Sequence, residues 1–207
     1  MANSTFSGPV RSKGGFTSIS ENSSTGAIST LSSISATGVS SFDANTLATE
    51  AGTGITTGSG TIYRSSVQRV GGIITTRILI DLTGLRSTGS GDIIGVDGTA
   101  LVCHIGQITA AQNGTILTGS MECFEAPAGG DPDINIHSAT EGTGVEDGAI
   151  ADLTETLLVN AGDATLGSKV FFSAVPAADQ FLYLTTGAAT EADYTPGKLF
   201  IEMMGYA

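Results

Sequence analysis

The sequence predicts an all-β fold: a β-sandwich or jelly-roll-like domain that follows an extended N-terminal arm. From residue 46 onward, about eight to ten short β-branched segments are separated by turn signals at intervals of roughly 8–12 residues. Helical periodicity is nearly absent. The 207 residues include 29 glycines, which suits a chain with many turns. A domain of this size can bury its own core without metals or disulfides.

We expect the chain to divide into an arm, residues 1–45, and a domain, residues 46–207. Ser, Thr and Gly make up more than half of the arm, and its apolar residues are irregularly spaced. A segment of this kind buries too little apolar surface to fold alone. Short pieces such as residues 26–31 indicate that the arm is partly strand. We therefore expect it to gain order from contacts outside itself.

The opening of the arm carries the residues that we expect to contact a partner. Its isolated apolar groups cannot bury themselves against so much Ser and Gly, so they suit pockets on a neighbouring subunit. A proline limits the entropy lost on binding, and two cations can meet acids there. The predicted contact residues are Phe6, Pro9, Val10, Arg11, Lys13 and Phe16. The alternative is a loose tail without a partner.

The clearest strands of the domain are predicted at residues 62–70 and 73–82, joined by the turn dipeptide Gly71-Gly72. In the second strand, residues of two kinds alternate with the period of a half-buried strand. The residues expected on its first face are Ile74, Thr76, Ile78, Ile80 and Leu82. The residues expected on its opposite face are Thr75, Arg77 and Asp81.

Turn signals delimit the later strands. Asp97-Gly98 and Asn113-Gly114 are dipeptides typical of hairpins. Residues 151–159 suit a helix and a strand equally, because their leucines make only a short helical face and their threonines favour a strand. The remaining strands are predicted at residues 101–105, 115–117, 120–125, 131–137, 170–174, 181–185 and 198–204.

The two cysteines and two histidines are the residues best suited to nucleophilic or acid–base chemistry. Cys103 and Cys123 lie on apolar segments, and we interpret them as buried free thiols, with a disulfide as the alternative. His104 has no carboxylate near it in the sequence, so we expect it to be packed or exposed rather than catalytic. Because adjacent strand residues point to opposite faces, Cys103 and His104 are not expected to form a dyad. His137 ends the predicted strand 131–137.

The acidic residues raise the possibility of a calcium site. The segment Asp131-Pro132-Asp133-Ile134-Asn135 begins like an EF-hand loop, which needs Gly at its sixth position and Glu at its twelfth. This chain has Ile136 and Gly142 at those positions, so the match fails. A less regular calcium site in the loop 138–150, with Glu141, Glu146 or Asp147 as ligands, remains one interpretation. The alternative is that these acids form a solvated surface.

Sequence motifs for catalysis are missing. Glu122 and Glu125 resemble the carboxylate pair of a glycosidase, but such pairs are common by chance in an acidic chain. The chain contains neither a phosphate-binding loop nor the Gly-x-Ser-x-Gly motif of serine hydrolases. We therefore predict a protein that is not an enzyme and that uses no cofactor and no metal.

Charge is unevenly distributed along the chain, whose net charge is −12. Residues 1–121 contain six bases and six acids, whereas residues 122–193 contain thirteen acids and a single base, Lys169. This half would repel a phosphate backbone, so we expect no nucleic-acid partner. No apolar run has the length of a membrane span and no secretory signal is recognised, so we expect synthesis in a cytoplasm and no membrane partner.

The opening residues, Ser4 to Phe16, resemble the start of small virion structural proteins of tailed bacteriophages, especially marine and cyanobacterial ones. In many of these proteins Glu-Asn stands where this chain has Lys13-Gly14. Three later stretches, residues 80–85, 91–95 and 141–148, also look like that group. The likeness consists of short similar stretches spread along the chain, and it includes no catalytic motif.

The resemblance implies a capsid decoration, or cement, protein on the outer surface of the virion. Such a protein would be a jelly-roll or β-sandwich homotrimer that binds the major capsid protein and braces the shell without covalent bonds, with the arm as the contact segment. The alternative is a short head or tail fibre-type protein that binds host-surface glycans. The chain has no Trp and four Tyr, which counts against a glycan-binding tip. A hydrolase that uses acidic residues ranks last.

Overall fold

The structure, a computed structural model, describes residues 16–21, 28–34, 46–98 and 100–207. The chain divides into two compact units, residues 1–43 and residues 44–207, and we call the second unit the body. The predicted boundary between residues 45 and 46 falls at the edge of the described part. In the first unit, β1 (Phe16–Glu21) pairs antiparallel with β2 (Ile28–Ile34), which overlaps the strand piece expected at 26–31.

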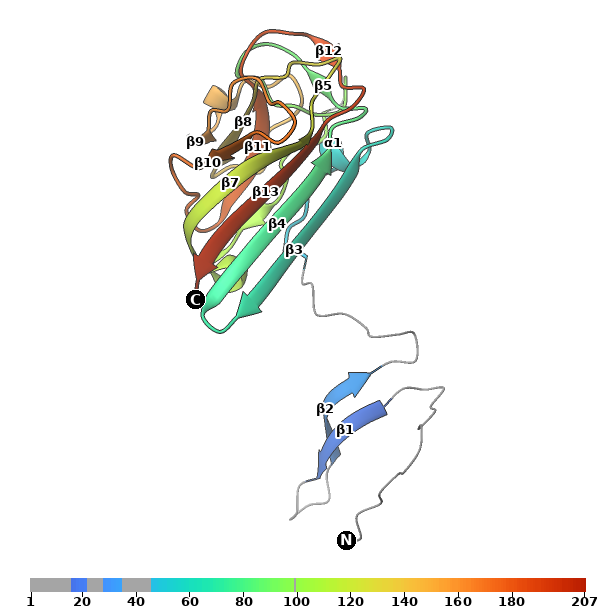
Figure 1. The fold of residues 1–207 in the computed structure, drawn as a ribbon, viewed down its shortest axis with the longest axis vertical. Coiled ribbons are helices and arrows are strands. Elements are labelled where there is room, and N and C mark those ends of the chain that lie inside the picture. The colour runs from blue at the N-terminus through green and yellow to red at the C-terminus, as the bar shows by residue number, and fades with distance from the viewer. Residues whose placement is uncertain (1–15, 22–27, 35–45, 99) are drawn as a thin grey trace. The chain divides into compact units, whose positions relative to one another are not determined.

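Five antiparallel strands form the larger sheet of the body, in the order β10-β7-β13-β4-β3 (Figure 1). Their bounds are Ile62–Val70 for β3, Ile73–Asp81 for β4, Thr115–Glu125 for β7, Lys169–Phe171 for β10 and Lys198–Tyr206 for β13. The C-terminal strand β13 lies at the centre, between β4 and β7. At one edge, β3 pairs with β4 alone along all nine of its residues.

Four antiparallel strands form the smaller sheet, in the order β6-β11-β8-β9. Their bounds are Gln107–Ile108 for β6, Ile134–Ala139 for β8, Glu155–Val159 for β9 and Gln180–Thr186 for β11. A short ladder joins β5 (Arg86–Ser87) to β12 (Ala192–Asp193). The predicted all-β class is confirmed, because the described strands all pair antiparallel and helices are few and short. The jelly-roll assignment and the extended arm stay predictions.

The helical elements of the described residues are single turns. They are α1 (Thr53–Thr56), α2 (Ala110–Asn113) and the 3-10 turn η1 (Ile150–Asp152). The segment that suits helix and strand equally therefore contains the end of a 3-10 turn followed by β9. The strand prevails because it pairs with β8 and buries Leu158 and Val159 in the core.

Two local predictions differ from the structure. Residues 101–105 are extended but form no regular strand, because their backbone bonds go to separate neighbours: Cys103 donates to Gly144 and Ile105 donates to Leu182. Asn113-Gly114 ends the turn of α2 and is not the turn of a hairpin. Gly114 has a φ of 67°, in the region that favours glycine, and β7 begins at the next residue.

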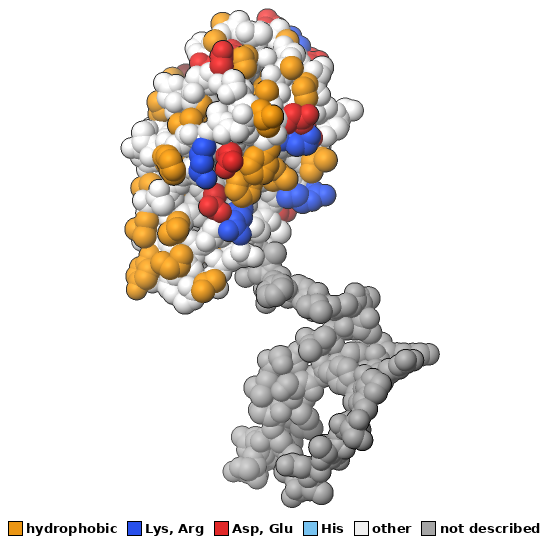
Figure 2. Space-filling model, in the orientation of Figure 1, with side chains coloured by type: hydrophobic (Ala, Val, Ile, Leu, Met, Phe, Trp, Pro, Cys, Tyr) orange, Lys and Arg blue, Asp and Glu red, His pale blue; other side chains and the backbone are white. Residues whose placement is uncertain are grey.

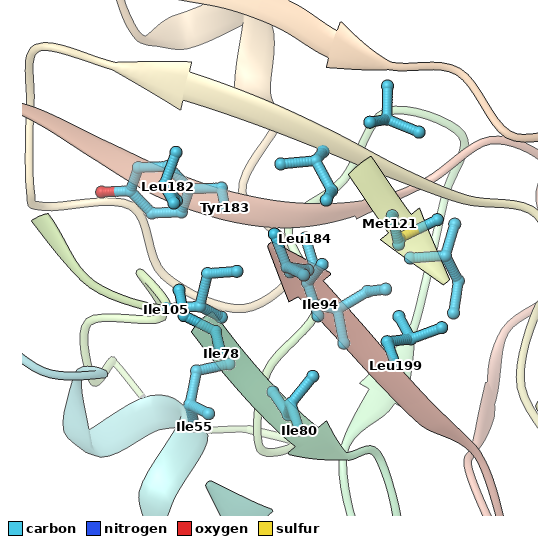
Figure 3. Packing of buried hydrophobic residues seen from close by; sticks show 14 of the residues in the cluster. Ile55, Ile78, Ile80, Ile94, Ile105, Met121, Leu182, Tyr183, Leu184 and Leu199 are labelled. Atoms are coloured by element: carbon cyan, nitrogen blue, oxygen red, sulfur yellow. The ribbon is translucent and has the colours of Figure 1, made fainter. Parts of the chain in front are cut away.

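A single hydrophobic core lies between the two sheets (Figure 3). The five-stranded sheet contributes β4 residues such as Ile78 and Ile80, which are fully buried, and the smaller sheet contributes Leu182 and Leu184 from β11. The predicted buried face of β4 is confirmed, since its five members, Leu82 included, have exposed fractions of at most 1%. Side chains from both layers thus interdigitate as in a sheet-on-sheet packing.

Candidate interaction face

The five-stranded sheet turns its second face away from the core, and we call the side chains on that side the outer face. Alternation along each strand decides its membership, because the residues between the buried ones must point outward. Its apolar members are Ile62, Val70, Ile73, Leu79, Phe124, Phe171, Phe200, Met204 and Tyr206. An antiparallel sheet normally carries polar residues on its solvated side, so this apolar content is unusual.

Charges on the outer face are balanced, unlike those on the rest of the body. Its charged members are Arg64, Arg77, Asp81, Glu122, Glu125, Lys169, Lys198 and Glu202. Residues 44–207 contain 18 acids and six bases, so four of each lie on the outer face and 14 acids with two bases lie elsewhere. The strongly acidic body therefore presents one neutral face.

Ion pairs hold most of these charges in place. Lys198 bridges Glu125 and the Asp81 carboxylate, which lies 3.3 Å from its ammonium. Arg77 contacts Glu202 at 2.7 Å across neighbouring strands. Hydrogen bonds to Glu125 and Asp81 raise the pKa of Lys198 above its usual value. Exposed pairs of this kind add little stability but fix the pattern of charge on the face.

Aromatic and apolar side chains fill the space between the ion pairs. Phe124 stacks on Phe200 with ring centroids 5.1 Å apart, although Phe124 is still half exposed to solvent. Phe171 is 68% exposed, and the Lys169 ammonium lies 6.0 Å from its ring centroid. Figure 2 shows hydrophobic side chains among blue and red ones on the side where Figure 1 shows the five-stranded sheet. Exposed apolar patches rimmed by charge are typical of protein–protein interfaces.

A hollow of about 340 Å³ lies within the outer face. Gly119 and Ser120 of β7 line it, with Phe171 and Met204 among its apolar walls. A Cβ on Gly119 would stand 2.7 Å from the Phe172 ring, so the glycine allows the ring to pack against the strand. The hollow has the size to accept one apolar side chain of a partner, as an anchor pocket does.

The sequence-predicted contact residues precede the body in the chain. Phe6, Pro9, Val10, Arg11 and Lys13 lie outside the described residues. Phe16 is the first residue of β1, where it pairs with Ile34 along the backbone. The predicted contact role of the arm therefore stays a prediction.

The residues considered for nucleophilic or acid–base chemistry are all buried. Cys103 and Cys123 are free thiols in the core, as predicted, and burial raises the pKa of Cys103 to about 12. His104 was expected to be packed or exposed, and it is packed: its ring centroid lies 4.9 Å from that of Phe181. Burial lowers the pKa of His104. Its Nδ1 has no hydrogen-bond partner among the described residues. His137 instead contacts Glu155, with 2.7 Å between Nδ1 and a carboxylate oxygen.

Acidic residues considered for catalysis or calcium binding face different partners. Glu122 contacts Lys169 and Glu125 contacts Lys198, so each carboxylate of the imagined pair has its own cation. Glu141 accepts hydrogen bonds from the backbone and hydroxyl of Thr154, both at 2.8 Å. Within the described ranges, no group of three His, Cys, Asp or Glu residues is arranged to hold a metal ion.

Sequence reasoning missed the outer face, although one signal for it exists. In β4 and β13 the outward positions include Leu79, Phe200 and Met204, so these strands carry apolar residues on both faces. Such a pattern predicts a second contact surface when the strand is not central to a three-layer structure. The ion pairs could not be found in the same way, because they join strands far apart in sequence.

Comparisons of the chain with protein-family models, with curated proteins and with solved structures find no match. Among the described residues, no helix has the length and apolar character of a membrane span.

Proposed function

We propose that this chain is a structural protein of a virus particle, a capsid decoration protein that binds the major capsid protein on the outside of the shell. The observation that carries the proposal is the outer face: a neutral surface with exposed aromatics on a body that is otherwise strongly acidic. The resemblance of the sequence to phage virion proteins suggests the major capsid protein as the partner. The outer face provides a surface that can bind it.

Adhesion by this face follows from its chemistry. Stacked aromatics and a hollow provide apolar contact area, and the ion pairs between them can orient the docked partner. The 14 acids elsewhere on the body would repel packaged nucleic acid, so the outer side of a shell is the favoured location. Many copies on one lattice bind by avidity, and no single contact has to be tight.

Two features of the proposal come from the resemblance. The predicted homotrimer would place three outer faces on one capsomer junction. The arm, with Phe6, Pro9 and Phe16, would add a second contact to the capsid or to a neighbouring copy. Both features are proposals, and the molecular mass of the protein in solution tests whether it is a homotrimer.

Location on the particle is the direct test of the proposed function. Particles from a culture that produces the chain are labelled with a gold-conjugated antibody against it and imaged in negative stain. We expect gold on the heads. Gold confined to tail tips would favour the fibre-type alternative, and particles without gold would overturn a virion function altogether.

Variants of the outer face test how the chain adheres. We expect the double variant Phe124→Ser, Phe200→Ser to stay folded and to lose at least tenfold in affinity for particles stripped of the native protein. The control is Leu166→Ser, which changes a more exposed apolar residue (74%, against 47% for Phe124) in the loop before β10, outside the sheet. Equal binding by both variants would contradict a role for the outer face.

A further inference from the structure

The edge strand β3 has an open side. Each of its nine residues pairs with β4, and among the described residues no other strand lies along it (Figure 1). The backbone bonds outside regular ladders include none from residues 62–70. A long edge strand of this kind is a template for pairing with another chain unless charge, proline or a bulge prevents it. β3 contains no proline, its register with β4 is regular, and its charged residues are Arg64 and Arg69.

The two arginines of β3 differ from the other described cations. Arg77, Arg86, Lys169 and Lys198 each contact a carboxylate, whereas Arg64 and Arg69 form no ion pair within the described part. Arg64 donates to the carbonyl of its neighbour Tyr63 at 2.7 Å. Two unpaired cations on one edge strand of an acidic protein call for an explanation.

An unpaired acid lies beside the same strand. A groove of about 390 Å³ follows the first half of β3, and Glu50 and Tyr63 are among its lining residues. The Glu50 carboxylate accepts a hydrogen bond from the Ser65 hydroxyl at 3.1 Å. No cation among the described residues forms an ion pair with it. Arg64 also lines this groove, so the groove holds one acid without an ion pair beside one base, at one end of a strand whose other end carries Arg69.

We propose that two copies of this chain pair antiparallel along β3, about a two-fold axis at Ser66, and so join their sheets into one. In this register residue 62 of one copy lies opposite residue 70 of the other. The second half of each β3 then runs beside the first half of the other, along the groove. Arg69 of each copy comes to the groove that holds Glu50 of the other, so the two unpaired charges meet twice.

The side chains of β3 match themselves in this register. On the outer face, Ile62 lies opposite Val70, which is 79% exposed in the single chain. Arg64 lies opposite Gln68, and Ser66 lies opposite itself. On the other side, Tyr63 lies opposite Arg69. No like charges are opposed, and both exposed apolar ends are covered, as favourable cross-strand pairs require.

Shifted registers match less well. Moving the two-fold axis by one residue in either direction removes residue pairs from the ladder. One of the two apolar end residues, Ile62 or Val70, then lies beyond the end of the other strand, and the other lies opposite a polar residue. The full register pairs all nine residues of β3 along its open side. This contact does not depend on the virion function, and two copies of the chain are enough to form it.

Cysteine crosslinking tests the register. In Ser66→Cys the two thiols are directly opposite, with Cβ atoms about 5 Å apart, which mild oxidation or a short thiol crosslinker can bridge. In the matched control, Gln68→Cys on the same face of the same strand, the two thiols are about 14 Å apart along the strands. We expect at least tenfold more crosslinked dimer from Ser66→Cys. The native cysteines are buried and should contribute little.

Charge reversal tests the pairing of Arg69 with Glu50. In the Ser66→Cys background, we expect Glu50→Arg and Arg69→Glu each to reduce the crosslinked fraction severalfold, and the two changes together to restore it. Circular dichroism checks that each variant is folded. Equal crosslinking by the two cysteine variants, or a double reversal no better than the singles, would overturn the proposal. Either result leaves the gold-labelling test of the virion function unaffected.

Discussion

His104 lies in the core with its ring against Phe181 and edge-on to Tyr183. Burial disfavours its charged form, which lowers its pKa below the ordinary value of 6.5. The unfolded chain therefore binds a proton that the folded chain rejects as the pH falls below about 6.5. This histidine therefore makes the fold less stable in mild acid.

Replacing His104 by Phe should remove part of this acid sensitivity. Between pH 7.5 and pH 5.5, we expect the free energy of unfolding to fall less in His104→Phe than in the native protein, by up to about 1.4 kcal/mol for one site over one pH unit. Urea unfolding at the two pH values measures the difference. His137 is present in both proteins and cancels. Equal losses would contradict the burial of a neutral His104.

The two thiols should be unreactive in the folded protein. Burial raises the pKa of both Cys103 and Cys123, and each thiol donates to a backbone carbonyl two residues away, at 3.3 Å. The thiolate is the reactive form, so we expect a chromogenic disulfide reagent at pH 8 to modify neither residue in native protein and both in urea. Rapid modification of the native protein would show that the core opens more readily than its packing implies.

In strand β4, adjacent residues point to opposite sides of the sheet. Ile78 is fully buried, whereas Leu79 is on the outer face. We expect Ile78→Ala to lower the free energy of unfolding by about 2–5 kcal/mol, because it leaves a cavity in the core. Leu79→Ser should cost under about 1.5 kcal/mol and reduce binding to particles. Urea titration of both variants measures the contrast, and similar losses would contradict this assignment of faces.

The strands that the sequence predicted best are those with their partners close by. For β3 the predicted residues 62–70 are also the observed ones, and for β4 the prediction ran one residue too far. Both belong to one hairpin with strong period-2 alternation. Residues 101–105 show the same alternation, yet their neighbours come from several separate segments. Alternation indicates that one side of an extended segment is buried. It does not indicate whether one continuous strand pairs with that segment.

At the scale of the whole molecule, the division into two units predicts that the body does not need the arm to fold. We expect a chain without residues 1–20 to unfold in urea at the same midpoint as the full chain, because the body has its own core. We also expect it to join particles poorly, since the predicted contact residues are removed. Sedimentation with particles measures this. Normal assembly would assign the contact to the body alone, and a lower midpoint would contradict independent folding.

The β class, the alternation of the hairpin β3–β4 and the excess of acids could all be predicted from the sequence, because they are properties of neighbouring residues and of composition. Tertiary structure alone decided that the bases of β4, β10 and β13 meet acids on one face, and that Glu50 lies beside a strand with an unpaired Arg69. Those groups are far apart in the chain, and strand order, which sets their distances, leaves no mark in local sequence.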